Sequence, residues 1–212
     1  MLTAEAIARE EPGPWGAHVA VAEVTGSTNH DLMAAARAGA GHGQVLFAEE
    51  QTRGRGRLGR HWHSPRGVNL YFSVLLYPPR LDITQFPPFA LVAGLAVAEA
   101  IHEATGLSAK VKWPNDVLIG RRKVAGLLTE ALPGSPAGLV VGVGLNVNQD
   151  RFPPDLREIA TSLALATGQV FRVGRCAADG RAGLQLGLYL RSVRAPDAFG
   201  GHGAFPRSAV GC

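Results

Sequence analysis

Short turns between β-like segments are the feature that most restricts how this chain can fold. Residues 110–119 form two such segments around Pro114 and Asn115, and the residues GRR at 120–122 lead directly into a third, KVAGLLTEAL. Strands joined by tight turns pair as antiparallel hairpins. The middle of the chain therefore predicts an antiparallel sheet.

The rest of the chain up to residue 170 alternates further strands with a few helices. The additional strands are expected at 18–24, 45–49, 69–77 and 139–148, and helices at 29–39, 89–106 and 155–166. Ser27 or Thr28 can cap the first helix. The predicted fold class is α+β, with a mixed, mostly antiparallel sheet backed by helices.

The chain has 212 residues, of which 46% are hydrophobic and 18% charged, enough for one domain with a buried core. We place this domain at residues 1–170. Residues 171–212 are an atypical C-terminal segment with eight glycines, six arginines and neither lysine nor glutamate. We expect this segment to be either a disordered tail or the product of a shifted reading frame.

Neither a membrane segment nor a disulfide framework is predicted. The N-terminus contains acidic residues, Pro and Gly and lacks the apolar run of a signal peptide. Ala90–Ile101 is apolar but short for a membrane span, and it contains Glu99. The two cysteines, Cys176 and Cys212, both lie in the last quarter, which argues against a disulfide framework and a cysteine metal site. We expect a soluble protein in the reducing cytoplasm.

Residues 51–67, QTRGRGRLGRHWHSPRG, contain five arginines and no acidic residue. Glycines let backbone N–H groups approach an anion, and the guanidinium matches phosphate or carboxylate. The loop is not a Walker A motif, because no Gly-Lys-Ser/Thr follows. Taken alone, its composition fits a solvated surface loop, a nucleotide site, or an RNA site with Trp62, Tyr71 and Phe72 as stacking partners.

The residues KWPND at 112–116 place a cation, an aromatic ring, an amide and a carboxylate around one turn. Asn115 can hydrogen-bond a nucleotide and Asp116 can hold Mg²⁺ at its phosphates, although an ordinary β-turn also favours both residues. Lys123 follows on the next strand, beside small residues. Its ammonium can stabilise charge at an acyl carboxylate and an α-phosphate. The alternative for Lys123 is a solvent-facing strand lysine.

Two more motifs point to a small polar ligand. GVGLNVN at 142–148 lacks the spacing and the following helix of a dinucleotide-binding motif. A glycine-rich strand can instead let a ligand approach the sheet closely. GSTN at 26–29 places two hydroxyls and an amide at the start of a helix, where they can bind a ligand or simply cap the helix.

The motifs GSTN, EEQTRGRGRLGRHWHSP with NLYFSVLL, KWPNDVLIGRRKVAGLLTE and VGVGLNVN occur in this order over about residues 20–168. Together they resemble the biotin protein ligases (biotin–acetyl-CoA-carboxylase ligases). The resemblance implies a mixed seven-stranded sheet backed by helices and a two-step reaction. Biotin and MgATP first give biotinyl-5′-AMP and pyrophosphate. The acyl group then passes to a lysine of a biotin carboxyl carrier protein.

The resemblance also implies site residues. It gives catalytic roles to Arg55, Arg57 and Lys123 and makes Asp116 the Mg²⁺ candidate. Biotin is expected to contact Ser27, Thr28, Asn29, Gln51, Gly54, Arg55, Gly56, Arg57, Lys123, Gly126 and Gly142. The nucleotide is expected to contact Arg57, Arg60, Trp62, Asn115, Lys123 and Asn146. Residues 51–67 would then be a lid, mobile without ligand and ordered over biotin or biotinyl-5′-AMP.

The expected partners are biotin, ATP and the carrier protein of a biotin-dependent carboxylase, with no DNA and no membrane. Only about 20 residues precede the first motif, which predicts a monofunctional ligase without a DNA-binding domain. Residues 171–212 do not show the small SH3-like domain with which this family usually ends. A biotin-binding relative with impaired ligation and a lipoate or octanoyl transferase therefore remain alternatives. A nucleic-acid-binding module would leave KWPND and Lys123 unexplained. An exposed sheet edge would allow a homodimer.

Overall fold

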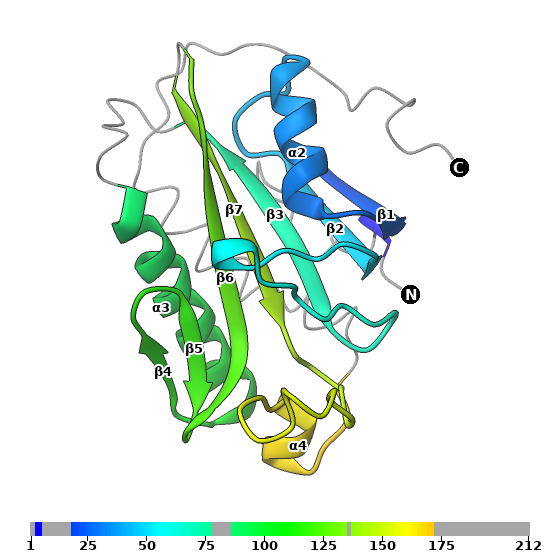
Figure 1. Ribbon diagram of the computed structural model, residues 1–212, viewed down its shortest axis with the longest axis vertical. Coiled ribbons are helices and arrows are strands. Elements are labelled where there is room, and N and C mark those ends of the chain that lie inside the picture. The colour runs from blue at the N-terminus through cyan, green and yellow to red at the C-terminus, as the bar shows by residue number, and fades with distance from the viewer. Residues whose placement is uncertain (1–2, 6–17, 78–85, 135–136, 172–212) are drawn as a thin grey trace.

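The computed structural model describes residues 3–5, 18–77, 86–134 and 137–171. These residues contain one seven-stranded sheet, in the order β1-β2-β3-β7-β6-β5-β4 (Figure 1). Its strands are β1 (Val19–Thr25), β2 (Val45–Gln51), β3 (Leu70–Leu76), β4 (Ala109–Lys112), β5 (Asp116–Ile119), β6 (Arg122–Leu132) and β7 (Gly138–Leu145). The helices are α2 (Thr28–Arg37), α3 (Phe86–Thr105), α4 (Leu163–Thr167) and the 3-10 turn η2 (Arg57–Gly59).

The pairing of the strands confirms the predicted fold class. Only β1 and β2 run parallel, and the other five pairings are antiparallel. The short turns of residues 110–132 produce the expected β4-β5-β6 meander, with Gly120 at a φ of 61° in the turn. A positive φ is accessible to glycine at little cost, which explains a glycine in this turn.

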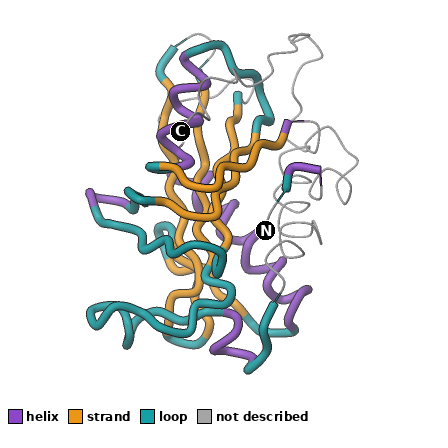
Figure 2. The backbone as a smooth tube through the Cα atoms, turned by 90° about the vertical axis from the view of Figure 1, so that its right-hand side faces the viewer, coloured by secondary structure: helices purple, strands orange, loops and turns teal. Residues whose placement is uncertain are grey.

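Each face of the sheet has its own hydrophobic cluster. On one face α3 packs against the sheet, with Val97 and Val141 in the cluster between them. On the opposite face Leu32 anchors α2. Figure 2 shows the long helix on one side of the sheet and α2 with the loops on the other. Because side chains alternate along a strand, Val141 faces α3, whereas Gly142 faces Asn29 of α2 and Gly144 faces Trp62 of the loop at 51–67.

The prediction of a helix at 155–166 is wrong, because only the last residues of this range belong to a helix, α4. Before α4 the backbone pairs with β6: Lys123 N–H donates to the Ile159 carbonyl at 2.8 Å, and Thr161 N–H donates to the Lys123 carbonyl at 2.8 Å. Residues 154–159 form hydrogen-bonded turns, and the bridge of Ala160 to Lys123 stops these turns from continuing as one helix into α4. Ser162 then caps α4 by accepting a hydrogen bond from Leu165 N–H at 3.1 Å.

Within the described part of the chain, no helix is long and apolar enough to cross a membrane. Residues from 172 onward are not among the described residues. The expectations for the C-terminal segment therefore concern residues outside the described part, as do those for Cys176 and Cys212.

His42 makes the folded protein sensitive to acid. Its Nδ1 accepts a hydrogen bond from Tyr77 N–H at 2.9 Å, and burial lowers the pKa of His42 below its usual 6.5. The unfolded chain therefore takes up a proton at a higher pH than the folded chain does. Stability contributed by the neutral imidazole is present above the unfolded-state pKa of 6.5 and is lost as the pH falls from there through the lower pKa of the folded state.

We expect His42→Asn, which keeps an acceptor but does not titrate, to reduce this loss. The measurement is the free energy of unfolding in urea at about pH 7.5 and about pH 5.5. An equal decrease in the original protein and in the variant would exclude His42 as its source.

Candidate active site

A cavity of about 700 Å³ lies on the face of the sheet opposite α3. Its volume is typical of sites for small molecules. Residues from GSTN, the arginine loop (residues 51–67), KWPND, β6, β7 and the segment 152–160 line it. The fold therefore brings together all the motifs that the sequence separates.

Nearly all the residues predicted for the site line this cavity. They are Ser27, Thr28, Asn29, Gln51, Arg55, Gly56, Arg57, Arg60, Trp62, Asn115, Asp116, Lys123, Gly126, Gly142 and Asn146. The exception is Gly54, whose carbonyl accepts a hydrogen bond from Trp62 N–H at 2.9 Å. A Cβ on Gly54 would lie 2.6 Å from Ser64 Oγ, so Gly54 allows the arginine loop to fold back on itself.

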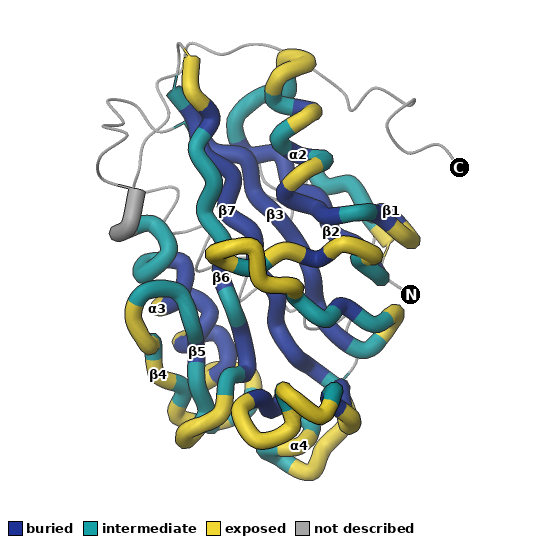
Figure 3. The backbone as a smooth tube through the Cα atoms, viewed as in Figure 1, coloured by how far each residue is buried: buried dark blue, intermediate teal, exposed yellow. Residues whose placement is uncertain are grey.

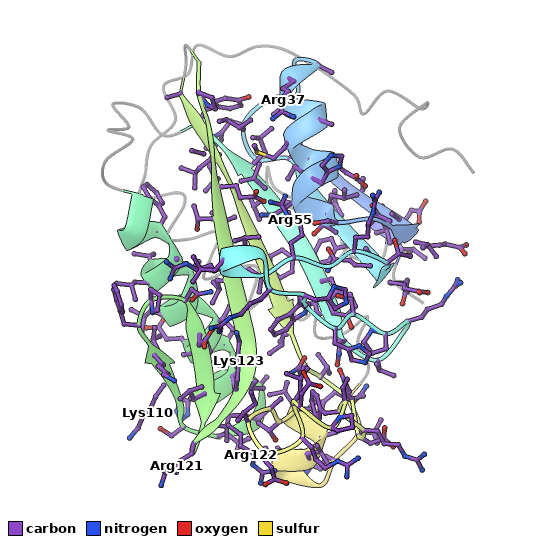
Figure 4. The ribbon with its side chains drawn as sticks, in the orientation of Figure 1. Arg37, Arg55, Lys110, Arg121, Arg122 and Lys123 are labelled. Carbon is purple, nitrogen blue, oxygen red and sulfur yellow. The ribbon has the colours of Figure 1, made fainter. Side chains whose placement is uncertain are left out.

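The cavity is lined by more positive than negative side chains. The arginines and lysines around it are Arg55, Arg57, Arg60, Lys112, Arg121 and Lys123, and Asp116 is the one carboxylate among the described lining residues. Figure 4 shows Arg121 at the tip of the β5–β6 hairpin and Lys123 on β6. Such an excess of cations favours an anionic ligand. Lys112 and Arg121 were not among the predicted site residues, although Lys112 lies within KWPND and Arg121 within the GRR turn.

Gln51, Thr28 and Ser64 form a hydrogen-bonded group that we call the floor of the cavity. Gln51 Oε1 accepts hydrogen bonds from Thr28 N–H at 2.9 Å and from the Thr28 hydroxyl at 3.2 Å. Its Nε2 donates to Ser64 Oγ at 3.1 Å. Ser27 occupies the N-cap position of α2, but its side chain makes no capping hydrogen bond. Capping therefore does not explain the Ser27 hydroxyl, which lines the cavity.

Lys123 is held by contacts of both its side chain and its backbone. Its Nζ lies 2.6 Å from Asp116 Oδ1 and 5.1 Å from the ring centroid of Trp62. Its backbone pairs with Leu118 of β5 and with the segment around Ala160. The ammonium is thus positioned by an ion pair and a cation–π contact at the cavity wall. The alternative of a solvent-facing strand lysine is wrong.

Trp62 lies against the glycines of the sheet. A Cβ on Gly126 would lie 2.8 Å from the Trp62 ring, and one on Gly144 would lie 2.5 Å from its Cε2. Only glycine therefore admits the ring at these positions. The glycine-rich strand was expected to let a ligand approach the sheet, and this stays a prediction: Gly142 and Gly144 line the cavity, and Gly144 also admits the Trp62 ring. Within the described residues, the buried Trp62 Nε1 has no hydrogen-bond partner.

Asn115 and Asn146 use their side chains to fasten backbone segments to the sheet. Asn115 Nδ2 donates to the Leu127 carbonyl at 2.7 Å, which holds the KWPND turn against β6. Asn146 Nδ2 donates to the Thr161 carbonyl at 3.0 Å. Both residues line the cavity, so each has a structural role beside its predicted contact with the nucleotide.

The arginine loop is a compact hairpin that crosses the cavity side of the sheet. Arg55 bridges to His61, and Gly56 N–H donates to the Arg60 carbonyl at 2.7 Å. At its tip Leu58 has a φ of 58° and is 89% exposed. Figure 3 shows the exposed loop passing in front of the buried strands β3 and β7. Its position over the cavity is the one expected of a lid.

Comparison with known proteins agrees with this geometry. Residues 21–148 match the model of the biotin/lipoate A/B protein ligase family. The bifunctional ligase/repressor BirA of Bacillus subtilis is 39% identical over 158 residues, which are 73% of this chain and 48% of that protein. The biotin–acetyl-CoA-carboxylase ligase of Mycobacterium tuberculosis is 41% identical over 143 residues, 66% of this chain and 52% of that protein. The chain thus spans about half the length of these relatives.

Two solved structures share the fold. The biotin protein ligase from Aquifex aeolicus in complex with biotin and ATP has a TM-score of 0.70 and 36% identity, covering 81% of this chain and 71% of that one. The biotin protein ligase from Leishmania major in complex with biotinyl-5-AMP has a TM-score of 0.66 and 25% identity, covering 89% of this chain and 85% of that one.

Proposed function

This chain belongs to the biotin/lipoate A/B protein ligase family, and from this premise we propose that it activates biotin with ATP and transfers it to a carrier-protein lysine. The observation that carries the proposal is the placement of Lys123. It lies at the wall of a cavity that has a floor of amides and hydroxyls and several more cations around it. Relatives with this fold bind biotin and ATP or biotinyl-5-AMP.

The first step joins two anions. A carboxylate oxygen of biotin attacks the α-phosphorus of ATP, and pyrophosphate leaves with the electrons of the broken P–O bond. Arg57, Arg60 and Lys123 offset the repulsion between the carboxylate and the phosphate and stabilise the charge of the transition state. The polar groups of Ser27 and Gln51 suit the N–H and C=O groups of the biotin ureido ring.

In the second step, the neutral amine of the carrier lysine attacks the acyl carbon, and AMP leaves. An amide bond forms, and the amine loses a proton. The mixed anhydride must be kept from water until the amine arrives. The arginine loop lies where it can cover the intermediate, and we propose that it orders when biotin or biotinyl-5′-AMP binds.

Asp116 suits Mg²⁺ that arrives with ATP better than it suits a resident metal ion. The described residues contain no group of three His, Cys, Asp or Glu side chains that could hold a metal. Mg²⁺ commonly binds one protein carboxylate together with substrate phosphates, and Asp116 lies among phosphate-binding candidates. The ion would neutralise phosphate charge. Lys123, which pairs with Asp116, would then be free to contact the ligand oxygens.

We further propose that residues 1–170 form the catalytic domain and that the reaction takes place in the cytoplasm, where ATP and carboxylases are present. The proposed partner is the biotin carboxyl carrier protein, and no role for DNA is proposed. Strands β1 and β4 form the edges of the described sheet, and an edge strand could pair with a second copy of the chain.

The test is to incubate the chain with MgATP, labelled biotin and a carrier domain. We expect label on the carrier and none on a carrier whose acceptor lysine is replaced by arginine. Formation of biotinyl-5′-AMP without transfer would indicate the impaired relative. In a parallel incubation with lipoate instead of biotin, transfer of lipoate but not of biotin would indicate a lipoate transferase. If neither adenylate nor transfer is detected, the proposal fails.

A further inference from the structure

Glu130 on β6 binds two elements of the site without lining the cavity. Its Oε1 lies 2.9 Å from Arg55 Nη2, and its Oε2 accepts a hydrogen bond from Arg55 Nη1 at 3.3 Å. The same Oε2 accepts a hydrogen bond from Asn29 Nδ2 at 2.9 Å. The Glu130 side chain is only 20% exposed. One largely buried carboxylate therefore holds both the arginine loop and the start of α2.

Asn29 continues this connection to the floor of the cavity. Its Oδ1 accepts a hydrogen bond from Ser73 Oγ at 2.6 Å, and Ser73 Oγ lies 2.7 Å from Thr28 Oγ1. Thr28 is bonded to Gln51. A continuous chain of polar contacts thus leads from Gln51, at the floor, to Glu130. Groups in one such network respond to changes in one another.

The pairing with Glu130 also limits what Arg55 can do. Its guanidinium makes two parallel contacts to one carboxylate, the geometry that gives charge-assisted pairs their strength and direction. Two of the five N–H donors of the guanidinium are engaged with Glu130 in this way, which fixes the direction in which the Arg55 side chain points. Its side chain then fixes the position of the loop, whereas Arg57 and Arg60 line the cavity and form no ion pair with another described residue.

We propose that Glu130 is a positioning residue: through Arg55 and Asn29 it couples the arginine loop to the floor on which biotin is expected to bind. Its kinetic consequence rests on the proposed function, whereas its effect on the loop does not. Removing the charge of Glu130 should loosen the loop and weaken biotin binding, with little effect on the chemical step, because Glu130 does not line the cavity.

The first test is limited chymotrypsin cleavage after Leu58 and Trp62, without biotin. We expect Glu130→Gln to be cut several-fold faster than the original chain, and Arg55→Gln to show the same effect because it removes the other half of the ion pair. Glu99→Gln is the control, since Glu99 is exposed on α3 at the opposite face. Unchanged cleavage of both loop variants would overturn the proposal. This result does not depend on whether the chain ligates biotin.

The second test is a double-mutant cycle on the KM for biotin. We expect Glu130→Gln to raise this KM about tenfold while kcat changes less than about twofold, with the same thermal midpoint. The double variant should raise the KM by less than the two single effects combined, because Glu130 acts in part through Arg55. Effects that simply add would overturn the proposal. If the original chain forms no adenylate, the proposed function fails, and the cleavage test still decides the role of Glu130.

Discussion

Lys123→Ala should slow formation of biotinyl-5′-AMP by about 10²- to 10³-fold, the usual cost of removing a group that stabilises the transition state. The ammonium is held at the cavity wall by its ion pair with Asp116 and by its contact with the Trp62 ring. Its removal also leaves the Asp116 carboxylate without this partner, close to where phosphates are expected. Single-turnover release of pyrophosphate measures the step directly.

The matched control is Lys110→Ala on β4, which removes an exposed lysine that does not line the cavity. This variant should retain the original rate within about twofold. The backbone pairing of Lys123 does not involve its side chain, so the unfolding midpoint of Lys123→Ala should stay close to the original. An unchanged rate of adenylate formation would show that Lys123 has no catalytic role.

Gly142→Ala should damage the site through Asn29. The new Cβ would lie 2.8 Å from Asn29 Cγ and closer still to its Oδ1, which is buried and hydrogen-bonded to Ser73. Overpacking of this kind costs about 1–3 kcal/mol. Because Asn29 must move, we also expect biotin affinity to fall at least about tenfold, which corresponds to about 1.4 kcal/mol.

Urea denaturation and calorimetric titration with biotin measure the two effects. Gly41→Ala is the control, because a Cβ there meets nothing within 4 Å. It should leave both the stability and the affinity unchanged. A Gly142→Ala variant that binds biotin as tightly as the original chain would show that the contact between β7 and Asn29 does not shape the site.

The sequence predicted the fold well where local chemistry determines it. Turns at Pro114–Asn115 and Gly120 specify the β4-β5-β6 meander, and β5 begins and ends at the predicted residues, Asp116 and Ile119. The prediction of a helix at 155–166 was wrong because local sequence does not determine the structure there. The conformation of these residues depends on pairing with Lys123, which is distant in sequence, and no local pattern contains that information.

In the site, too, the motifs predicted which residues lie together, but not the contacts that depend on residues distant in sequence. The motifs placed almost every expected residue around one cavity, including Lys123 and Asp116. They did not predict that Gly144 accommodates Trp62 or that Glu130 holds Arg55. Both contacts depend on strand register and on how the arginine loop crosses the sheet. Glu130 does lie in the quoted motif KVAGLLTE, so a signal was present, but its partner could not be identified from spacing.

The pairing of Lys123 with residues 159–161 has a consequence for dissecting the protein. All the strands of the described sheet end by Leu145, so a fragment stopping shortly afterwards would contain the whole sheet. It would nevertheless lack the carbonyl of Ile159 and the N–H of Thr161 that hold the Lys123 backbone, and the Thr161 carbonyl that binds Asn146. A fragment that keeps Lys123 in place must therefore extend past the sheet, through Thr161 and into α4.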